Sequence, residues 1–484
     1  MKTIGNVQQD AQIRAVASGT LSNGDTVIVN SDGTVSAVGG SSVSAATGSA
    51  TVYEADEASW TAAAYDSNAN KVVIAYNDTN NGQIGTAVVG TISGTTISFG
   101  TPVVFQSSVV YYITATFDSS ANKVVIAYHN NGSSGQGTAI VGTVSGTSIS
   151  FGSAAVFETG NTIWTAATFD SSNNKVVIAY RDASNSNYGT AVVGTVSGTS
   201  ISFGSPTVFE SARSDHVAIT FDSSNNKIVI AYEDDANSDA GTAIVGTVSG
   251  TSISFGSAVV YRSGGSYSNS IAFDSSSNQV VIVYNKISGT YQGAAIVGSV
   301  SGTSISFGAE NVFNANQSDY LKIVYNSAAN KVVIAYSDVG NSSYLTLQEG
   351  TISGTSVSFG SDVILDNTGD SNYMSMAYDT NEAVSVVSYA PVASSNKGTA
   401  IVRQTAYTST NITSDNFIGF ADSGYVNGQN VGVDSTCSIN SGQTSLTAGQ
   451  KYYVQTDGSL SETADDPSVE AGIAISATKI LVKG

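Results

Sequence analysis

The chain is poor in cysteine, proline and basic residues, and these shortages exclude several classes of protein. Among its 484 residues there is a single cysteine, Cys437, so no disulfide can form within the chain and a cysteine-based zinc site is not expected. Lysine and arginine number 17 against 37 aspartates and glutamates, which gives a net charge of -20. Because binding to nucleic acid needs clustered basic side chains, this balance argues against a nucleic acid as a partner.

Long apolar segments are also missing. No stretch approaches the roughly 18 continuous apolar residues of a membrane-spanning helix. The first residues, "MKTIGNVQQDAQIRAVASG", lack the apolar core of a signal peptide. We therefore expect no membrane insertion, and synthesis in a cytoplasm without export by the usual route.

What the sequence does contain is one phrase written seven times. "FDSSNNKVVIAY" begins at Phe169, and a second phrase, "VGTVSGTSISFG", follows most copies. A period of about 50 residues indicates a repeat architecture. The copies begin 52 residues apart five times and then 53 apart, at Tyr65, Phe117, Phe169, Phe221, Phe273, Tyr325 and Tyr378.

Each repeat has the composition of four short strands. In the third repeat these are "WTAATFD", "KVVIAYR", "GTAVVGTVSG" and "TSISFGSPTVF", rich in Val, Ile, Thr, Tyr and Phe and separated by turn residues. Seven such units predict an all-β fold, a seven-bladed β-propeller with four-stranded blades, over residues 42–407. A straight solenoid is the structural alternative, but solenoids usually carry atypical capping repeats at their ends.

The two ends of the repeat region favour a closed ring. The seventh unit lacks its "TSISFGSxxVF" strand, and a matching segment, "SAATGSATVYEAD", precedes the first unit at Ser44 to Asp56. An N-terminal strand that completes the last blade removes an exposed sheet edge. An open solenoid would have no reason for this permutation.

The flanks, residues 1–41 and 408–484, share a hairpin-like phrase. "GDTVIVNSDGTVSAV" starts at Gly24 and "GQKYYVQTDGSLSET" at Gly449, each with an Asp-Gly turn. Ring closure makes both flanks leave the propeller at one blade. We predict that they pack together as one discontinuous β domain; two independent small domains are the alternative.

Within the repeats, one set of connections is constant and another varies. The turns "DSSNNK" and "SGTS" are nearly identical in the copies, whereas the loops after the second strand and the segments leading into the next blade, such as "ETGNTI" and "ESARSD", differ. Antiparallel strands place these two sets on opposite faces. Loops displayed on a rigid scaffold often carry recognition, although unconstrained drift gives the same pattern.

One position on the varied face is mostly aromatic. It lies five residues before each Phe or Tyr anchor, at the entry to the innermost strand, where the side chains should encircle the mouth of the central channel. Such rings can stack on the apolar faces of sugars, or they can simply wedge between blades. The predicted ligand-binding residues are Trp60, Tyr112, Trp164, His216, Tyr320 and Tyr373, with Ser268 breaking the pattern in the fifth blade.

Signals for metal, cofactor or catalysis are weak. Asp78, Asp182, Asp234 and Asp338 recur after the second strand, where calcium binding and an ordinary Asx turn are both open readings, the turn being the commoner. No nucleophile, zinc-protease or phosphate-loop motif is present. We expect no metal, no cofactor and no enzymatic activity.

The flanks also carry a resemblance. "SGTLSNGDTVIVNSDGTVSAV", "NFIGFADSGYVNGQNVGV" and "TAGQKYYVQTDGSLSETADDPSVEAGIAISATKILVKG" resemble the flanking modules of virion fibre and appendage proteins of marine tailed bacteriophages, and the repeated phrase is similar to repeats in such proteins. The resemblance implies a virion-surface protein, made in the host cytoplasm and released by lysis. Its flanks would contact other virion proteins or assemble it as a homo-oligomer, with trimers common among phage fibres.

The sequence thus favours a non-enzymatic tail fibre or appendage whose varied face binds a host-surface glycan or protein. A purely structural capsid or tail decoration protein is the alternative. A polysaccharide-cleaving enzyme with paired carboxylates is a third hypothesis.

Overall fold

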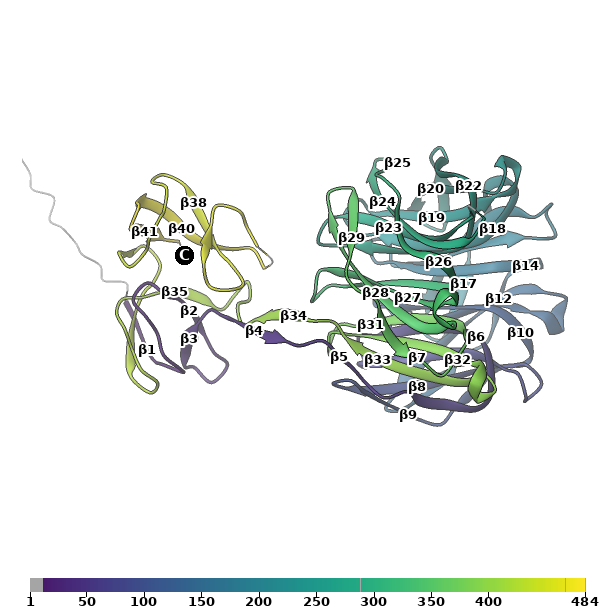
Figure 1. Ribbon diagram of the computed structural model, residues 1–484, viewed down its shortest axis with the longest axis horizontal. Helices are drawn as coiled ribbons and strands as arrows, with labels where there is room; N and C mark the ends of the chain where they lie inside the picture. The colour runs from purple at the N-terminus through teal and green to yellow at the C-terminus, as the bar shows by residue number, and fades with distance from the viewer. Residues whose placement is uncertain (1–11, 288, 466, 484) are drawn as a thin grey trace, which may run out of the picture. The chain divides into compact units, whose positions relative to one another are not determined.

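The computed structural model describes residues 12–287, 289–465 and 467–483. Contacts divide the chain into two units, Ala45–Thr405 and the pair Met1–Ser44 with Ala406–Gly484. The boundaries lie within three residues of those expected from the sequence. The larger unit is the seven-bladed propeller and the smaller one is built from both flanks (Figure 1).

Each blade of the propeller starts with an inner strand and adds three strands outward. The inner strands are β6 (Thr51–Asp66), β10 (Val103–Asp118), β14 (Ala155–Asp170), β18 (Thr207–Asp222), β22 (Val259–Asp274), β26 (Asn311–Asn326) and β31 (Ser371–Asp379). The second strands, which carry the "KVVIAY" phrase, are β7 (Lys71–Asp78), β11 (Lys123–Asn130), β15 (Lys175–Asp182), β19 (Lys227–Asp234), β23 (Gln279–Ile287), β27 (Lys331–Asp338) and β32 (Val384–Pro391).

The two outer strands of each blade form the "SGTS" hairpin. The third strands are β8 (Ile84–Ser93), β12 (Gln136–Ser145), β16 (Tyr188–Ser197), β20 (Ala240–Ser249), β24 (Tyr291–Ser301), β28 (Tyr344–Ser353) and β33 (Lys397–Gln404). The short fourth strands are β9 (Thr96–Phe99), β13 (Ser148–Phe151), β17 (Ser200–Phe203), β21 (Ser252–Phe255), β25 (Ser304–Phe307), β29 (Ser356–Phe359) and, in blade seven, β5 (Ala46–Thr47).

The passage from one blade to the next differs from the prediction. The segments expected to be loops, such as "ETGNTI", lie inside 16-residue strands. The first part of β14 pairs with β12 of the preceding blade, and its second part pairs with β15 of its own blade. β-Bulges let the chain turn between the two sheets without leaving the ladder, so the backbone groups stay paired. Only before blade seven is the strand interrupted, between β30 (Val363–Asp366) and β31.

Four of the loops after the second strands contain a single 3-10 turn. Ser108 Oγ donates to Asn130 Oδ1 at one such loop, so the loop and the crossing segment share a face. Among the described residues, no helix has the length and apolar character needed to cross a membrane. The 3-10 turns are η1 (Asn131–Ser133), η2 (Asp235–Asn237), η3 (Val339–Asn341) and η4 (Val392–Ser394).

The ring closes through the N-terminal strand, as the missing strand of the seventh repeat predicted. Thr51 to Glu57 of β6 pair with β33 of blade seven, and Ala58 to Asp66 pair with β7 of blade one. The pairing of β8 in blade one with β10, which leads into blade two, completes the ring. The N-terminal strand therefore covers the edge of blade seven that would otherwise be exposed.

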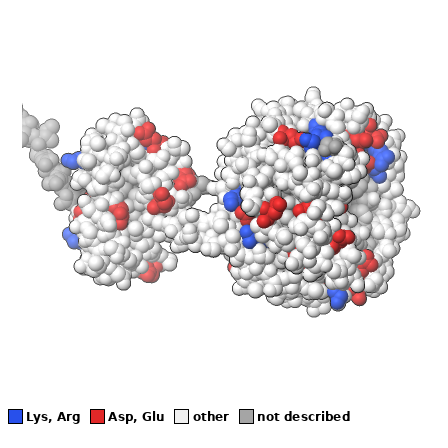
Figure 2. Space-filling view, viewed as in Figure 1, with Lys and Arg blue, Asp and Glu red and all other residues white. Residues whose placement is uncertain are grey.

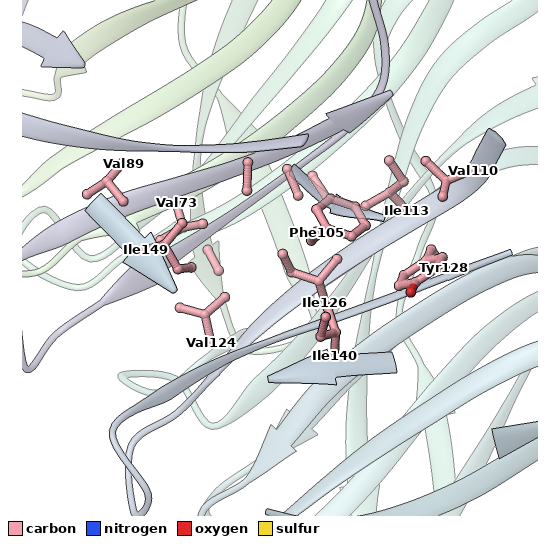
Figure 3. Packing of buried hydrophobic residues seen from close by; sticks show 14 residues of the cluster. Val73, Val89, Phe105, Val110, Ile113, Val124, Ile126, Tyr128, Ile140 and Ile149 are labelled. Carbon is pink, nitrogen blue, oxygen red and sulfur yellow. The ribbon is translucent and has the colours of Figure 1, made fainter. Parts of the chain in front are cut away.

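The core lies between blades, and the second strands explain it. Their "VVIAY" residues are fully buried, because each such strand is covered on both faces by neighbouring blades. Val124, Ile126 and Tyr128 pack toward blade one, as Figure 3 shows, whereas Val125 and Ala127 pack toward blade three. The period of two in a strand thus lets one phrase supply two interfaces.

The flank unit is a discontinuous β domain. One sheet interleaves the two termini in the order β1 (Gln12–Val16), β36 (Asn430–Asp434), β35 (Phe417–Ala421), β2 (Thr26–Val29) and β3 (Val35–Ala37). The second sheet has the order β37 (Ile439–Asn440), β41 (Lys479–Val482), β40 (Val469–Ser476), β38 (Lys451–Val454) and β39 (Leu460–Ser461), and a ribbon joins β4 (Gly40–Val43) to β34 (Tyr407–Thr410).

Both hairpins expected in the flanks are present. β2 pairs with β3 and β38 with β39, with the turn glycines Gly33 and Gly458 at φ 81 and 86 degrees. Ile28 and Phe420 share one apolar cluster with Val454 and Ala471, so the two sheets bury a common core. Neither flank has this core without the other.

Candidate functional site

A β-bulge in every inner strand builds the candidate site. In blade one, Ser59 pairs with Asn77 and Ala62 with Ala75, so β6 has one residue more than its partner between these pairs. Corresponding register shifts occur in the other six inner strands. The first unpaired residue of each bulge is the position singled out in the sequence.

All seven of these residues have a left-handed backbone. Glycine is the residue that normally takes such a conformation in a bulge, and for an aromatic side chain it costs about 1–2 kcal/mol. A chain with 49 glycines uses none here. The φ angles are 51 degrees at Trp60, 49 at Tyr112, 55 at Trp164, 50 at His216, 51 at Ser268, 56 at Tyr320 and 49 at Tyr373.

The bulges bring the seven side chains to one cavity of about 410 Å³. Six of them form a continuous arc of ring contacts. Ser268 adds no ring at the bulge of blade five, although the adjacent Tyr267 contacts His216 at 5.1 Å. We call these six aromatic residues the collar. Its centroid distances are 5.9 Å for Tyr320–Tyr373, 5.9 Å for Tyr373–Trp60, 4.5 Å for Trp60–Tyr112, 5.4 Å for Tyr112–Trp164 and 4.2 Å for Trp164–His216.

The collar both packs and faces the cavity. Trp60 and Trp164 rest on the apolar clusters between blades, which supports the packing interpretation of these positions. The collar residues are nevertheless only partly buried, and Tyr320 is 38% exposed. An aromatic ring anchored on one side and open on the other is suited to stacking against a flat apolar ligand surface.

Two titratable groups at the collar are neutral at pH 7. Burial, together with the positive charges of Lys322, Arg181 and Arg213, lowers the pKa of His216 to about 4. Glu233 Oε2 lies 3.6 Å from His216 Nε2, but burial and the nearby Asp239 raise the pKa of Glu233 to about 8. The two therefore do not form an ion pair at neutral pH.

Below the collar, the cavity continues into a channel of about 260 Å³. Its wall includes the residue that follows each bulge, and these are small with one exception. Lys322 occupies the place held by Ala62, Thr114, Ala166, Ala218, Ser270 and Ser375 in the other blades. Sequence reasoning missed Lys322, although aligning the seven repeats at their anchors would have isolated it.

Hydrogen bonds within the protein hold the recurrent aspartates of the variable loops. Asp182 Oδ1 accepts hydrogen bonds from the amides of Ser184 and Asn185 at 3.0 Å, which is an Asx turn. Asp338 accepts from the side chain of Asn314 at 2.9 Å. Within the described residues, no three His, Cys, Asp or Glu side chains gather as a metal site.

Comparison with known proteins gives the fold. No protein-family model and no curated protein matches this chain. Among solved structures, the BP39L lectin from Burkholderia pseudomallei superposes with a TM-score of 0.55 at 10% identity, over 74% of this chain and 98% of the lectin. A protein of unknown function from Dyadobacter fermentans DSM 18053 has a TM-score of 0.47 at 11% identity, over 74% and 99% of the two chains. At these identities the likeness to the lectin is one of fold, and it agrees with the propeller.

Proposed function

We propose that this protein binds carbohydrate at the collar and is not an enzyme. The observation that carries the proposal is the arc of aromatic rings, held in a costly left-handed backbone around one open cavity. A strained backbone at an aromatic residue, repeated at the same position in six blades, is a pointer to function. Sugar rings offer apolar faces to aromatic side chains and hydroxyls to the polar groups between them.

The fold of the lectin supports the same reading. The BP39L lectin shares the architecture over nearly its whole length, although at 10% identity no residue is carried over. The cavity also suits an oligosaccharide in its volume and in its mixture of rings with Ser, Thr and Asn side chains.

Tryptophan fluorescence provides a direct test. The chain has two tryptophans, and both line the cavity. Titration of the full chain with a panel of bacterial surface polysaccharides should shift the emission for a ligand that stacks there. Absence of any shift, together with absence of heat in calorimetry, would refute the proposal.

A matched pair of variants locates the site. Tyr112 lies between Trp60 and Trp164, and Tyr112→Asn removes the ring while keeping a residue that tolerates the left-handed backbone. We expect this variant to lose at least tenfold in affinity. Tyr291→Ala removes an exposed tyrosine that does not line the cavity, and it should bind as the wild type does. Ligand chain length measured after incubation should stay constant; release of new reducing ends would favour the enzyme hypothesis.

We further propose that this carbohydrate-binding protein is part of a virion. On the resemblance of the flanks, we propose a tail fibre or appendage that presents the propeller to a host-surface glycan or protein, with several copies raising avidity. None of the comparisons points to a phage protein. Immunogold labelling of virions, and light scattering of the full chain for a homo-oligomer, would test this part separately from sugar binding.

A structural decoration role is the second candidate, and one repeated feature favours it. Each blade leaves one aliphatic side chain exposed at the same position near its outer edge. We call these seven residues the rim, a surface that another subunit would contact. The seven residues are Val52, Val104, Val156, Val208, Val260, Val312 and Ile364. Replacing several of them with threonine should reduce co-assembly with virion proteins and leave sugar binding unchanged if the rim is an assembly surface.

A further inference from the structure

The cavity has a polar sector as well as an aromatic one. The arc of rings opens at Ser268 in blade five, and Asn269 and Lys322 line the cavity in blades five and six. These two residues also line the channel below, so they belong to both volumes. Asn269 and Lys322 therefore lie beside the gap in the collar.

Lys322 has no carboxylate to balance its charge. No ion pair to it is found among the described residues, and burial alone lowers its pKa. Asp215, which precedes His216 in the chain, pairs with Arg181 and Arg213, and Asp319 accepts hydrogen bonds from Gln317. A lysine in a cavity is normally paired, so this one is open to an external anion.

Three basic side chains lie close enough to the collar to act on one of its members, and Asp215 pairs with two of them, Arg181 and Arg213. Lys322, Arg181 and Arg213 all act on His216, in a protein whose net charge is -20. Figure 2 shows acidic side chains scattered over the face in view. Because Asp215 pairs with both arginines, Lys322 is the basic group of the three that is left to attract an anionic ligand.

Neutral donors complete the site. Asn269 is 7% exposed, and its Oδ1 accepts hydrogen bonds from Tyr261 and Ser266 at 3.0 and 2.8 Å, while its Nδ2 has no partner. Thr165 Oγ1, on the same cavity, and Ser375 Oγ, in the channel, also lack partners. Buried polar atoms without partners are rare in proteins, and a ligand would satisfy them.

From these contacts, and resting on the proposed sugar binding, we infer that the preferred ligand is an acidic sugar. Its ring would stack on the collar, and its anionic group would reach Lys322 with the Asn269 amide as a second donor. A uronic acid residue has this combination of an apolar face and a carboxylate, and a sulfated sugar is the other source of the same chemistry.

The experiment compares three probes on the full-length protein by calorimetry and tryptophan fluorescence. They are an oligogalacturonate, the same oligomer with its carboxyl groups reduced to alcohols, and a sulfated galactan oligomer. We expect the wild type to bind an anionic probe about ten- to hundredfold more tightly than the neutral one, the range for a hydrogen-bonded charge. The comparison of the two anionic probes separates carboxylate from sulfate.

Lys322→Ser should abolish this preference, so that the anionic and neutral oligomers bind with similar affinity; blades five and seven already carry serine at that position. Lys322→Met provides a second variant that keeps the side-chain volume. Lys175→Met, at the start of β15 outside the cavity, is the matched control and should keep the preference.

The two proposals fail in different ways. Equal affinity for neutral and anionic probes in the wild type, or a preference that survives Lys322→Ser, would overturn the acidic-sugar inference while collar binding stands. Failure of every probe to bind would overturn both.

Discussion

Gly48→Ala should destabilise the contact between blades seven and one that closes the ring. A Cβ at Gly48 would lie 3.0 Å from the Thr95 carbonyl carbon and closer still to its oxygen, in the hairpin of the next blade. This backbone oxygen cannot swing aside as a flexible side chain would, so the two blades must separate. Overpacking of this kind costs about 2–3 kcal/mol.

The chain supplies both a positive and a negative control. Gly152→Ala meets the Thr199 carbonyl in the same way between two interior blades, whereas Gly360→Ala has only Glu349 O, at 3.9 Å. The difference arises because blade seven has no hairpin of its own at this place. Gly360→Ala should therefore be neutral, or stabilise by about 0.5 kcal/mol through the unfolded state.

Urea denaturation followed by far-UV circular dichroism measures the three variants against the wild type. Gly48→Ala and Gly152→Ala should lower the midpoint by similar amounts. If Gly48→Ala behaved like Gly360→Ala, the seam between blades seven and one would not be packed as the other blades are, and the closed ring would be refuted.

Three further outcomes are expected. Tyr180→Phe removes the buried hydroxyl that donates to Glu158 Oε2 at 3.1 Å, and should cost about 1–2 kcal/mol of unfolding free energy in urea titrations; an unchanged midpoint would contradict it. Glu233→Gln should gain stability over the wild type as pH rises from about 4.5 to 8, because the folded carboxyl keeps its proton to about pH 8 while the unfolded one loses it near 4.5. The gain reaches about 4 kcal/mol at pH 8 and levels off just above it, and a pH-independent difference would be the contrary result. Ser268→Tyr, which closes the gap in the collar, should weaken binding of an oligogalacturonate more than binding of its carboxyl-reduced form; equal losses for the two would place the entry of the anionic group elsewhere.

The fold was predictable because the sequence repeats one four-stranded unit. Seven copies of one phrase give the number of blades, and the displaced segment at Ser44 to Asp56 gives the closure without any energetic estimate. The blade crossings were misread for a physical reason. Segments such as "ETGNTI" have the composition of loops, but bulges keep them paired within a strand.

The position of the site was also visible in the sequence, whereas its geometry was not. A fixed offset from each anchor placed Trp60 and its counterparts at the channel mouth, where the structure has them. The left-handed backbone was hidden because nothing in the residue type Trp or Tyr signals positive φ, as glycine or asparagine would. Lys322 was hidden because a lysine between Leu321 and Ile323 reads as the solvent-facing side of an alternating strand.

Ring symmetry explains why the informative residues are the exceptions. Seven equal blades would make a collar with seven equal sectors, which can grip a ligand along the axis but cannot orient it. Three departures from the repeat at this level are adjacent: Ser268 opens the arc in blade five, Asn269 lines the cavity beside it and has an unpartnered amide nitrogen, and Lys322 adds the charge in blade six. Polar groups beside the gap, opposite aromatic rings, would orient a ligand in the cavity. The sevenfold phrase therefore accounts for the rigidity of the site, and its three neighbouring exceptions account for the selectivity that we propose.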